Sequence, residues 1–180
     1  MNLIKDFNDA LPLYKYESIL GDQMALHRLH YRKAVERRPK IKIPPLKILV
    51  ITVPLCGDSL AIIPVLHKYF KNCEVEIRVA LREESPILMN RFLTNGKKSV
   101  PVIIVLDKQG NYLFRYGPRP RPAQKIYEQM RPFIESGQVQ KMEVSKKIRA
   151  FYAKDRGESI IDEFENVLSE VLENIEVNNP

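Results

Sequence analysis

The sequence predicts an α/β domain with a mixed central sheet flanked by helices. Two observations indicate this fold class. Short apolar segments rich in β-branched residues alternate with segments of helical periodicity, and the last two apolar segments are joined by a short turn. Strands that alternate with helices usually pair in parallel, whereas strands joined by a tight turn pair antiparallel. We therefore expect both kinds of pairing in one sheet.

The composition is that of a globular chain with a real core. The 180 residues are 44% hydrophobic. No apolar run approaches the roughly 20 residues of a membrane-spanning helix. The first residues lack the layout of a signal peptide, so a cytoplasmic location without membrane attachment is expected. The only cysteines are Cys56 and Cys73, so no disulfide framework is implied.

Three regions are expected along the chain. Residues 1–45 form an N-terminal helical extension, residues 46–136 form the α/β domain, and residues 137–180 form a C-terminal helical extension. In the first region a helix is predicted from Ser18 to Arg38. Ser18 is a suitable N-cap, and the prolines that follow Arg38 stop a helix and begin a linker.

The central domain begins with a strand and a helix. Residues 46–53 are almost continuously apolar, as expected for a strand buried on both faces of a sheet. A helix is predicted to follow from Asp58 or Ser59 to about Asn72, because its apolar residues recur at helical spacing. Pro64 lies inside this helix and is expected to kink it.

The later elements of the domain complete the sheet. A second strand is predicted over residues 74–81, followed by a helix over residues 85–93. Two further strands, residues 102–106 and 112–116, are joined by a turn and form a hairpin. A helix over residues 121–136 closes the domain.

The last helix, predicted over residues 159–176, has a narrow apolar seam. Its apolar residues recur at steps of three and four, and they are Ile161, Phe164, Leu168, Val171 and Ile175. A seam of this width is expected to pack on one partner helix.

Charge is distributed unevenly. The formal net charge is +7; residues 27–47 hold eight lysines and arginines against one acid, and residues 155–180 hold eight acids against one arginine. A solvated helix face is the simplest interpretation of the basic stretch, and a nucleic-acid surface is not favoured. The opposed charges also allow the two ends to dock, within one chain or across a homodimer.

Cys56 is the candidate reactive residue, because it lies between a buried strand and a helix. Free N–H groups and the helix dipole stabilise a thiolate there, and the thiolate is the attacking form of cysteine. Gly57 lets the backbone turn tightly. Asp58 favours the helix start, but its charge raises the thiol pKa, and these two effects oppose each other. Ser59 either donates a hydrogen bond to the thiolate or serves as a helix-start residue.

This organisation resembles the thioredoxin superfamily, over roughly residues 47–136. The first strand leads into Cys56-Gly57-Asp58-Ser59 at the position of the family's C-x-x-C motif, and Pro64 lies where thioredoxins have a helix-kinking proline. The site with its Cys-Gly-Asp sequence is similar to that of a bacterial thioredoxin-like subgroup.

Two further positions carry the resemblance. Val100-Pro101 precedes the third strand, where the family has a cis-proline that faces the active cysteine. Gly117 follows the fourth strand, near a glycine that is common in thioredoxins. If Pro101 is cis, it is expected to shape a groove in which an extended substrate pairs. The resemblance thus implies a site made of Cys56 and Ser59, with Gly57, Asp58, Val100 and Pro101 contacting substrate.

The chain departs from the family in ways that bear on activity. Ser59 replaces the resolving cysteine, Leu55 stands in place of a tryptophan, and Val50 stands in place of a buried aspartate that assists proton transfer. Cys73 is not a substitute resolver, because it lies 17 residues further on in the sequence, near the far end of the same helix. That separation is roughly 25 Å. A disulfide needs Cα atoms within about 7 Å.

The resemblance and its departures imply a monothiol thiol–disulfide oxidoreductase, with a protein or small-molecule thiol or disulfide as partner and no cofactor or metal. Two alternatives stay open. The fold is retained as a redox-inactive protein-binding module, or it carries iron–sulfur or another metal, as in monothiol glutaredoxins. His27 and His30 are expected to face solvent. A run of arginines after the last strand, Arg115, Arg119 and Arg121, forms either an anion site or a solvated loop.

Overall fold

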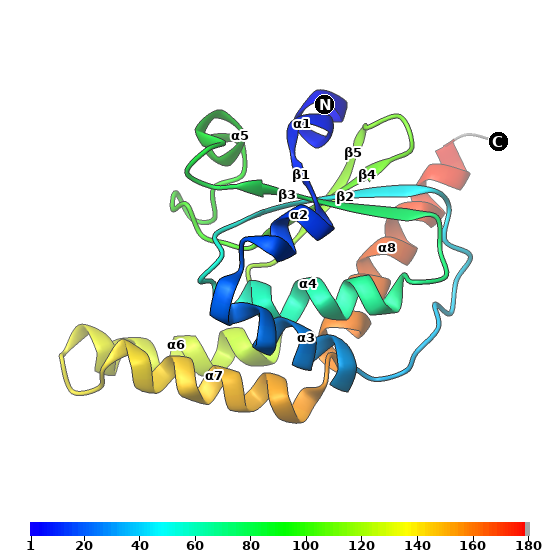
Figure 1. The fold of residues 1–180 in the computed structure, drawn as a ribbon. Coiled ribbons are helices and arrows are strands. Elements are labelled where there is room, and N and C mark those ends of the chain that lie inside the picture. The colour runs from blue at the N-terminus through cyan, green and yellow to red at the C-terminus, as the bar shows by residue number, and fades with distance from the viewer. Residues whose placement is uncertain (179–180) are drawn as a thin grey trace.

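A mixed five-stranded sheet lies between two layers of helices in the computed structural model, which describes residues 1–178 (Figure 1). None of the helices within those residues is both long and apolar enough to cross a bilayer. In chain order the elements are α1 (Ile4–Asp9), β1 (Leu11–Pro12), α2 (Leu13–Ser18), the 3-10 helix η1 (Gly21–Gln23), α3 (Met24–Lys33), β2 (Leu46–Thr52), α4 (Gly57–Tyr69), β3 (Val75–Leu81), α5 (Pro86–Arg91), β4 (Val102–Asp107), β5 (Tyr112–Tyr116), α6 (Arg121–Glu135), α7 (Lys141–Asp155) and α8 (Glu158–Asn178).

The sheet has the order β1-β3-β2-β4-β5 and contains both kinds of pairing. Strands β2 and β3 are parallel, with Val50 opposite Val79, and α4 forms the crossover between them. Strand β4 is antiparallel to both β2 and β5. The mixed α/β class is therefore confirmed, and the four strands of the central domain lie within about a residue of their predicted bounds.

The N-terminal region differs from its prediction. Helix α3 covers only Met24–Lys33, and Ser18 is the last residue of α2 rather than a cap. Beyond α3 the backbone at Ala34 is extended, and Lys68 Nζ on α4 donates to the Ala34 carbonyl at 2.7 Å. A tertiary contact thus holds the chain just after the helix, where local periodicity alone predicted continuation to Arg38.

Strand β1 was also not predicted. It is only two residues long, and it pairs antiparallel with β3, so that Leu11 lies opposite Val79 at one edge of the sheet. The region before residue 45 therefore adds an edge strand as well as helices. The boundaries of the three regions stay a prediction.

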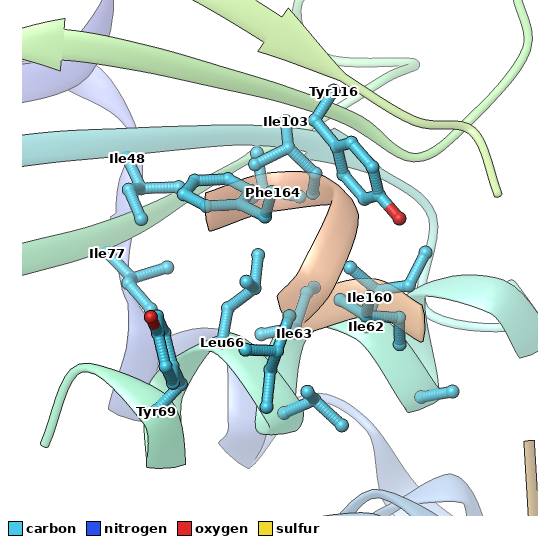
Figure 2. Packing of buried hydrophobic residues seen from close by; sticks show 14 of the residues in the cluster. Ile48, Ile62, Ile63, Leu66, Tyr69, Ile77, Ile103, Tyr116, Ile160 and Phe164 are labelled. Atoms are coloured by element: carbon cyan, nitrogen blue, oxygen red, sulfur yellow. The ribbon is translucent and has the colours of Figure 1, made fainter. Parts of the chain in front are cut away.

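One face of the sheet packs against α4 and α8. Phe164 of α8 is fully buried between the sheet and α4, close to Ile48, Ile103 and Leu66 (Figure 2). Its ring lies 5.4 Å from the Phe114 ring, measured between centroids. The apolar seam of the last helix therefore packs on the sheet as well as on α4, and not on a single helix as predicted.

The opposite face is covered by α1 and α5 (Figure 1). Phe7 of α1 and Met89 of α5 are fully buried there against Leu49, Ile51 and Ile104. Strands β2 and β4 are thus apolar on both faces, as a central strand covered by two helical layers must be.

The basic and acidic ends of the chain meet within one molecule. Arg37 follows α3, and its guanidinium lies 3.0 Å from Glu158 and 2.5 Å from Asp162 on α8. Glu165 is buried on the same helix. Its carboxylate lies 3.5 Å from Nη2 of Arg37 and accepts a 2.7 Å hydrogen bond from the Tyr69 hydroxyl. The opposed charges therefore dock α8 on the segment after α3.

Candidate functional site

Cys56 lies between the end of β2 and the start of α4, a helix most of whose residues are buried. It occupies the N-cap of α4, in extended backbone, and its carbonyl accepts the Leu60 N–H at 3.1 Å. The thiol is half-buried, and Sγ lies 3.6 Å from the Val100 carbonyl oxygen, to which the S–H donates. The Val100–Pro101 peptide bond is cis. The fold thus brings together Cys56 and Val100-Pro101, which are 44 residues apart at their nearest contact.

Gly117, which follows β5, packs its backbone closely against the backbone of Pro101. It has φ of +105°, which L side chains rarely adopt, and a Cβ at this position would lie 2.6 Å from the Pro101 carbonyl oxygen. The backbones of Gly117 and Pro101 lie so close together that no side chain fits at residue 117. The glycine after β5 is therefore required by the close approach of the loop that carries Pro101.

Asp58 is buried at the first turn of α4, and two distant residues hold it. The Tyr152 hydroxyl on α7 donates a 2.7 Å hydrogen bond to Asp58 Oδ1. Arg119, in the loop after β5, places Nε 2.9 Å from Oδ2. The Arg119 N–H is not aimed at that oxygen, so the contact is an ion pair rather than a hydrogen bond. Nothing in the local sequence around Asp58 indicated the Tyr152 contact, since 94 residues separate the pair.

The pKa of Asp58 is raised, chiefly because burial disfavours the carboxylate. The Arg119 charge and the Tyr152 hydrogen bond partly offset this effect. Arg119 also stacks over the Tyr127 ring at 4.8 Å from its centroid, which fixes the guanidinium in place.

Ser59 is fully buried and shares a hydrogen bond with the Thr52 hydroxyl at the end of β2. Tyr16 of α2 is also fully buried, and its hydroxyl has no well-oriented partner among residues 1–178. Burial raises the pKa of Tyr16, and a charge on Cys56 raises it further, while Thr52 lowers it. These buried hydroxyls therefore lie near Cys56, since Ser59 acts on the thiol and Tyr16 senses both Thr52 and a charge on Cys56.

The electrostatics of Cys56 combine opposing effects. Burial is the largest, and it raises the pKa of the thiol; the negative charge of Asp58 raises it further. The Ser59 side chain and the backbone N–H groups of Ser59 and Asp58 act in the other direction. The net effect raises the pKa of the Cys56 thiol, so the helix start does not outweigh burial.

Other candidate residues lie away from the sulfur. Cys73 is a free thiol beyond the C-terminal end of α4. His27 is buried rather than solvent-facing, because it packs edge-on against Tyr16 and lies 3.0 Å from Glu17; that expectation was wrong. Within residues 1–178, no group of three His, Cys, Asp or Glu side chains is placed to hold a metal ion.

Comparison with known proteins places the fold in a family. A family model described as thioredoxin matches residues 23–131, which is more than half of the chain. The chain belongs to this thioredoxin family. No curated protein matches it.

Two solved structures share the fold of this thioredoxin-family protein. One is a crystal structure of a protein of unknown function from Pseudomonas aeruginosa, with 13% identity, a TM-score of 0.64, and coverage of 94% of this chain and 98% of that one. The other is an HIV epitope-scaffold, with 12% identity, a TM-score of 0.63, and coverage of 94% and 99%. At this identity both structures bear on the fold alone.

Proposed function

We propose that this thioredoxin-family protein performs monothiol thiol–disulfide exchange through Cys56. The supporting observation is the position of Sγ, half-buried at the start of α4 and 3.6 Å from the carbonyl that precedes Pro101. Ser59 occupies the position of a resolving thiol, so the chemistry needs a second thiol from outside the protein. A cytoplasmic setting, which contains small thiols, fits this requirement.

The exchange has two steps. The Cys56 thiolate attacks one sulfur of a disulfide, a new S–S bond forms to that sulfur, and the other sulfur leaves as a thiolate. An external thiolate then attacks the substrate sulfur of the mixed disulfide and releases Cys56. Gly57 and Asp58 at the helix start, with Val100 and Pro101 opposite, would contact the substrate. Val100 and Pro101 supply backbone for pairing with an extended segment.

The test is trapping of the mixed disulfide. The wild-type protein and the Cys73→Ser variant are expected to gain the mass of one substrate half when treated with a disulfide, and Cys56→Ser is not. The adduct should persist until a small thiol is added, because no internal thiol resolves it. Equal trapping by the two single variants would remove Cys56 from the proposed role.

A second candidate is a binding module without turnover. The raised pKa of the Cys56 thiol favours it, since burial and the Asp58 charge both oppose the thiolate. If this candidate holds, Cys56→Ser retains partner binding, and wild-type protein forms no adduct even at about pH 9, where an ordinary thiol is mostly ionised. An iron–sulfur or metal carrier ranks last, and a colourless protein after anaerobic purification would count against it.

A further inference from the structure

A cavity of about 510 Å³ is lined in part by Val100, the residue whose carbonyl faces Cys56, and its lining is strongly basic. Five cationic side chains line it, and no carboxylate does; the cations are Arg82, Lys97, Lys98, Arg119 and Arg131. The volume falls within the range of small-molecule sites, which is about 300–1,000 Å³.

Two residues that line the cavity also contact residues at the start of α4. Val100 lines the cavity, and the carbonyl of the same residue lies 3.6 Å from Sγ of Cys56. Arg119 also lines it and reaches Asp58, two residues after Cys56. The lining of the cavity thus includes two residues that reach the start of α4, at Cys56 and at Asp58.

The positive charge of the cavity is only partly neutralised. Arg82 pairs with Glu83 and Arg131 pairs with Glu135, but both carboxylates are well exposed, and ion pairs of this kind contribute little. Lys97 is exposed and forms no ion pair among the residues that the structure describes. The same holds for Lys98. A carboxylate that enters the cavity can thus gain these two free ammonium groups without breaking a buried pair.

We propose that this cavity binds the carboxylates of a small disulfide whose sulfur reacts with Cys56. The assignment rests on the proposed exchange function. Asp58 repels an anionic disulfide that approaches the sulfur, and the cations of the cavity reverse the sign of the local field. The protein therefore selects acidic disulfides.

The experiment compares three small disulfides of different charge: dithiodiglycolate is anionic, hydroxyethyl disulfide is neutral and cystamine is cationic. Adduct formation is followed by intact mass in the full chain, with the Cys73→Ser variant measured alongside to assign the adduct to Cys56. Wild-type protein is expected to react about tenfold faster with dithiodiglycolate than with hydroxyethyl disulfide at low salt, and slowest with cystamine. The preference should shrink as salt is added.

The decisive variant is Lys97→Gln with Lys98→Gln, and the ratio of the anionic to the neutral rate is the readout. This ratio should fall severalfold. The matched control is Lys42→Gln with Lys108→Gln, which removes the same charge from two exposed lysines in a cavity at the other end of β4. An equal fall in the control, or no anionic preference in wild type, overturns the assignment.

Two further outcomes separate the cavity from the chemistry. If none of the disulfides reacts with Cys56, the exchange function fails, and the cavity is then judged by calorimetry of dithiodiglycolate with Cys56→Ser. Binding that weakens in the Lys97→Gln, Lys98→Gln background upholds the anion site, and absence of binding overturns it. A disulfide-linked acidic peptide that reacts about tenfold faster than dithiodiglycolate would replace the small-molecule assignment with a peptide.

Discussion

Tyr152 donates a 2.7 Å hydrogen bond to Asp58, and this contact joins the C-terminal helices to the first turn of α4. Asp58 is the nearest carboxylate in sequence to Cys56, so a residue of α7 helps to determine the charge that the thiol experiences. The C-terminal region thus contributes to the electrostatics of the site as well as to the core.

Asp58→Asn is expected to make Cys56 more reactive. The substitution removes a negative charge that raises the pKa of the thiol, so the thiolate fraction at neutral pH rises. We expect iodoacetamide to alkylate Cys56 about threefold to tenfold faster, measured in a Cys73→Ser background. Glu170→Gln, on the exposed face of α8, is the control and should leave the rate unchanged. An unchanged rate in Asp58→Asn would show that Asp58 does not influence the thiol.

The pH dependence of alkylation should reveal the raised pKa of Cys56. Because burial raises it, the thiolate forms only as pH rises beyond the range in which an ordinary cysteine ionises, about pH 8.5. The alkylation rate of the Cys73→Ser protein should therefore still be increasing where the rate of a free cysteine peptide has levelled off. If the alkylation rate of the protein levels off at a lower pH than that of the peptide, the raised pKa of Cys56 is contradicted.

Ser59→Ala should shift that profile to still higher pH. The Ser59 side chain lowers the pKa of Cys56, so its loss leaves burial and Asp58 less opposed. It also removes one hydrogen-bond partner of the buried Thr52 hydroxyl, which keeps the Val53 carbonyl, so the expected cost is about 0.5–1.5 kcal/mol of unfolding free energy. Ser169→Ala, on α8, removes a hydroxyl that bonds only an exposed glutamate and serves as the control. A profile identical to wild type would assign Ser59 a structural role alone.

Gly117→Ala is expected to destabilise the protein and disturb the site. The new Cβ would meet the Pro101 carbonyl at 2.6 Å in addition to the strain of a positive φ. We expect a loss of about 1–3 kcal/mol in urea unfolding, together with altered Cys56 reactivity. Gly137→Ala is a matched control, because its φ is also positive but its Cβ would meet open space. Equal losses would attribute the effect to φ alone.

Arg37→Ala should weaken the docking of α8. Arg37 is only 17% exposed and contacts Glu158, Asp162 and Glu165, so its loss leaves the acids of α8 repelling one another. A loss of about 1–2 kcal/mol is expected at low salt, and less at high salt. Arg131→Ala breaks an exposed pair with Glu135 and should cost no more than about 0.5 kcal/mol. Indistinguishable variants would show that the Arg37 cluster is not stabilising.

Much of the central domain was predictable because its signals are local. The apolar strand that ends at Thr52 and the hairpin from Val102 to Tyr116 depend on the side chains of each segment and on their turns. Cys56, at the boundary between a strand and a helix, was recognisable for the same reason. The length of α3 was not, because the Lys68 contact at Ala34 comes from another helix.

The sequence by itself determined the class of sheet, the thiol at the start of α4 and the absence of a second cysteine near it, since alternation, helix starts and residue identity are properties of neighbouring residues. Only the tertiary structure decided the environment of that thiol. The partial burial of the thiol against Val100, the contacts of Asp58 with Tyr152 and Arg119, and the basic cavity lined by Val100 all depend on segments distant in sequence. A pKa depends on which charges and how much solvent surround a group, and those surroundings exist only once the chain has folded.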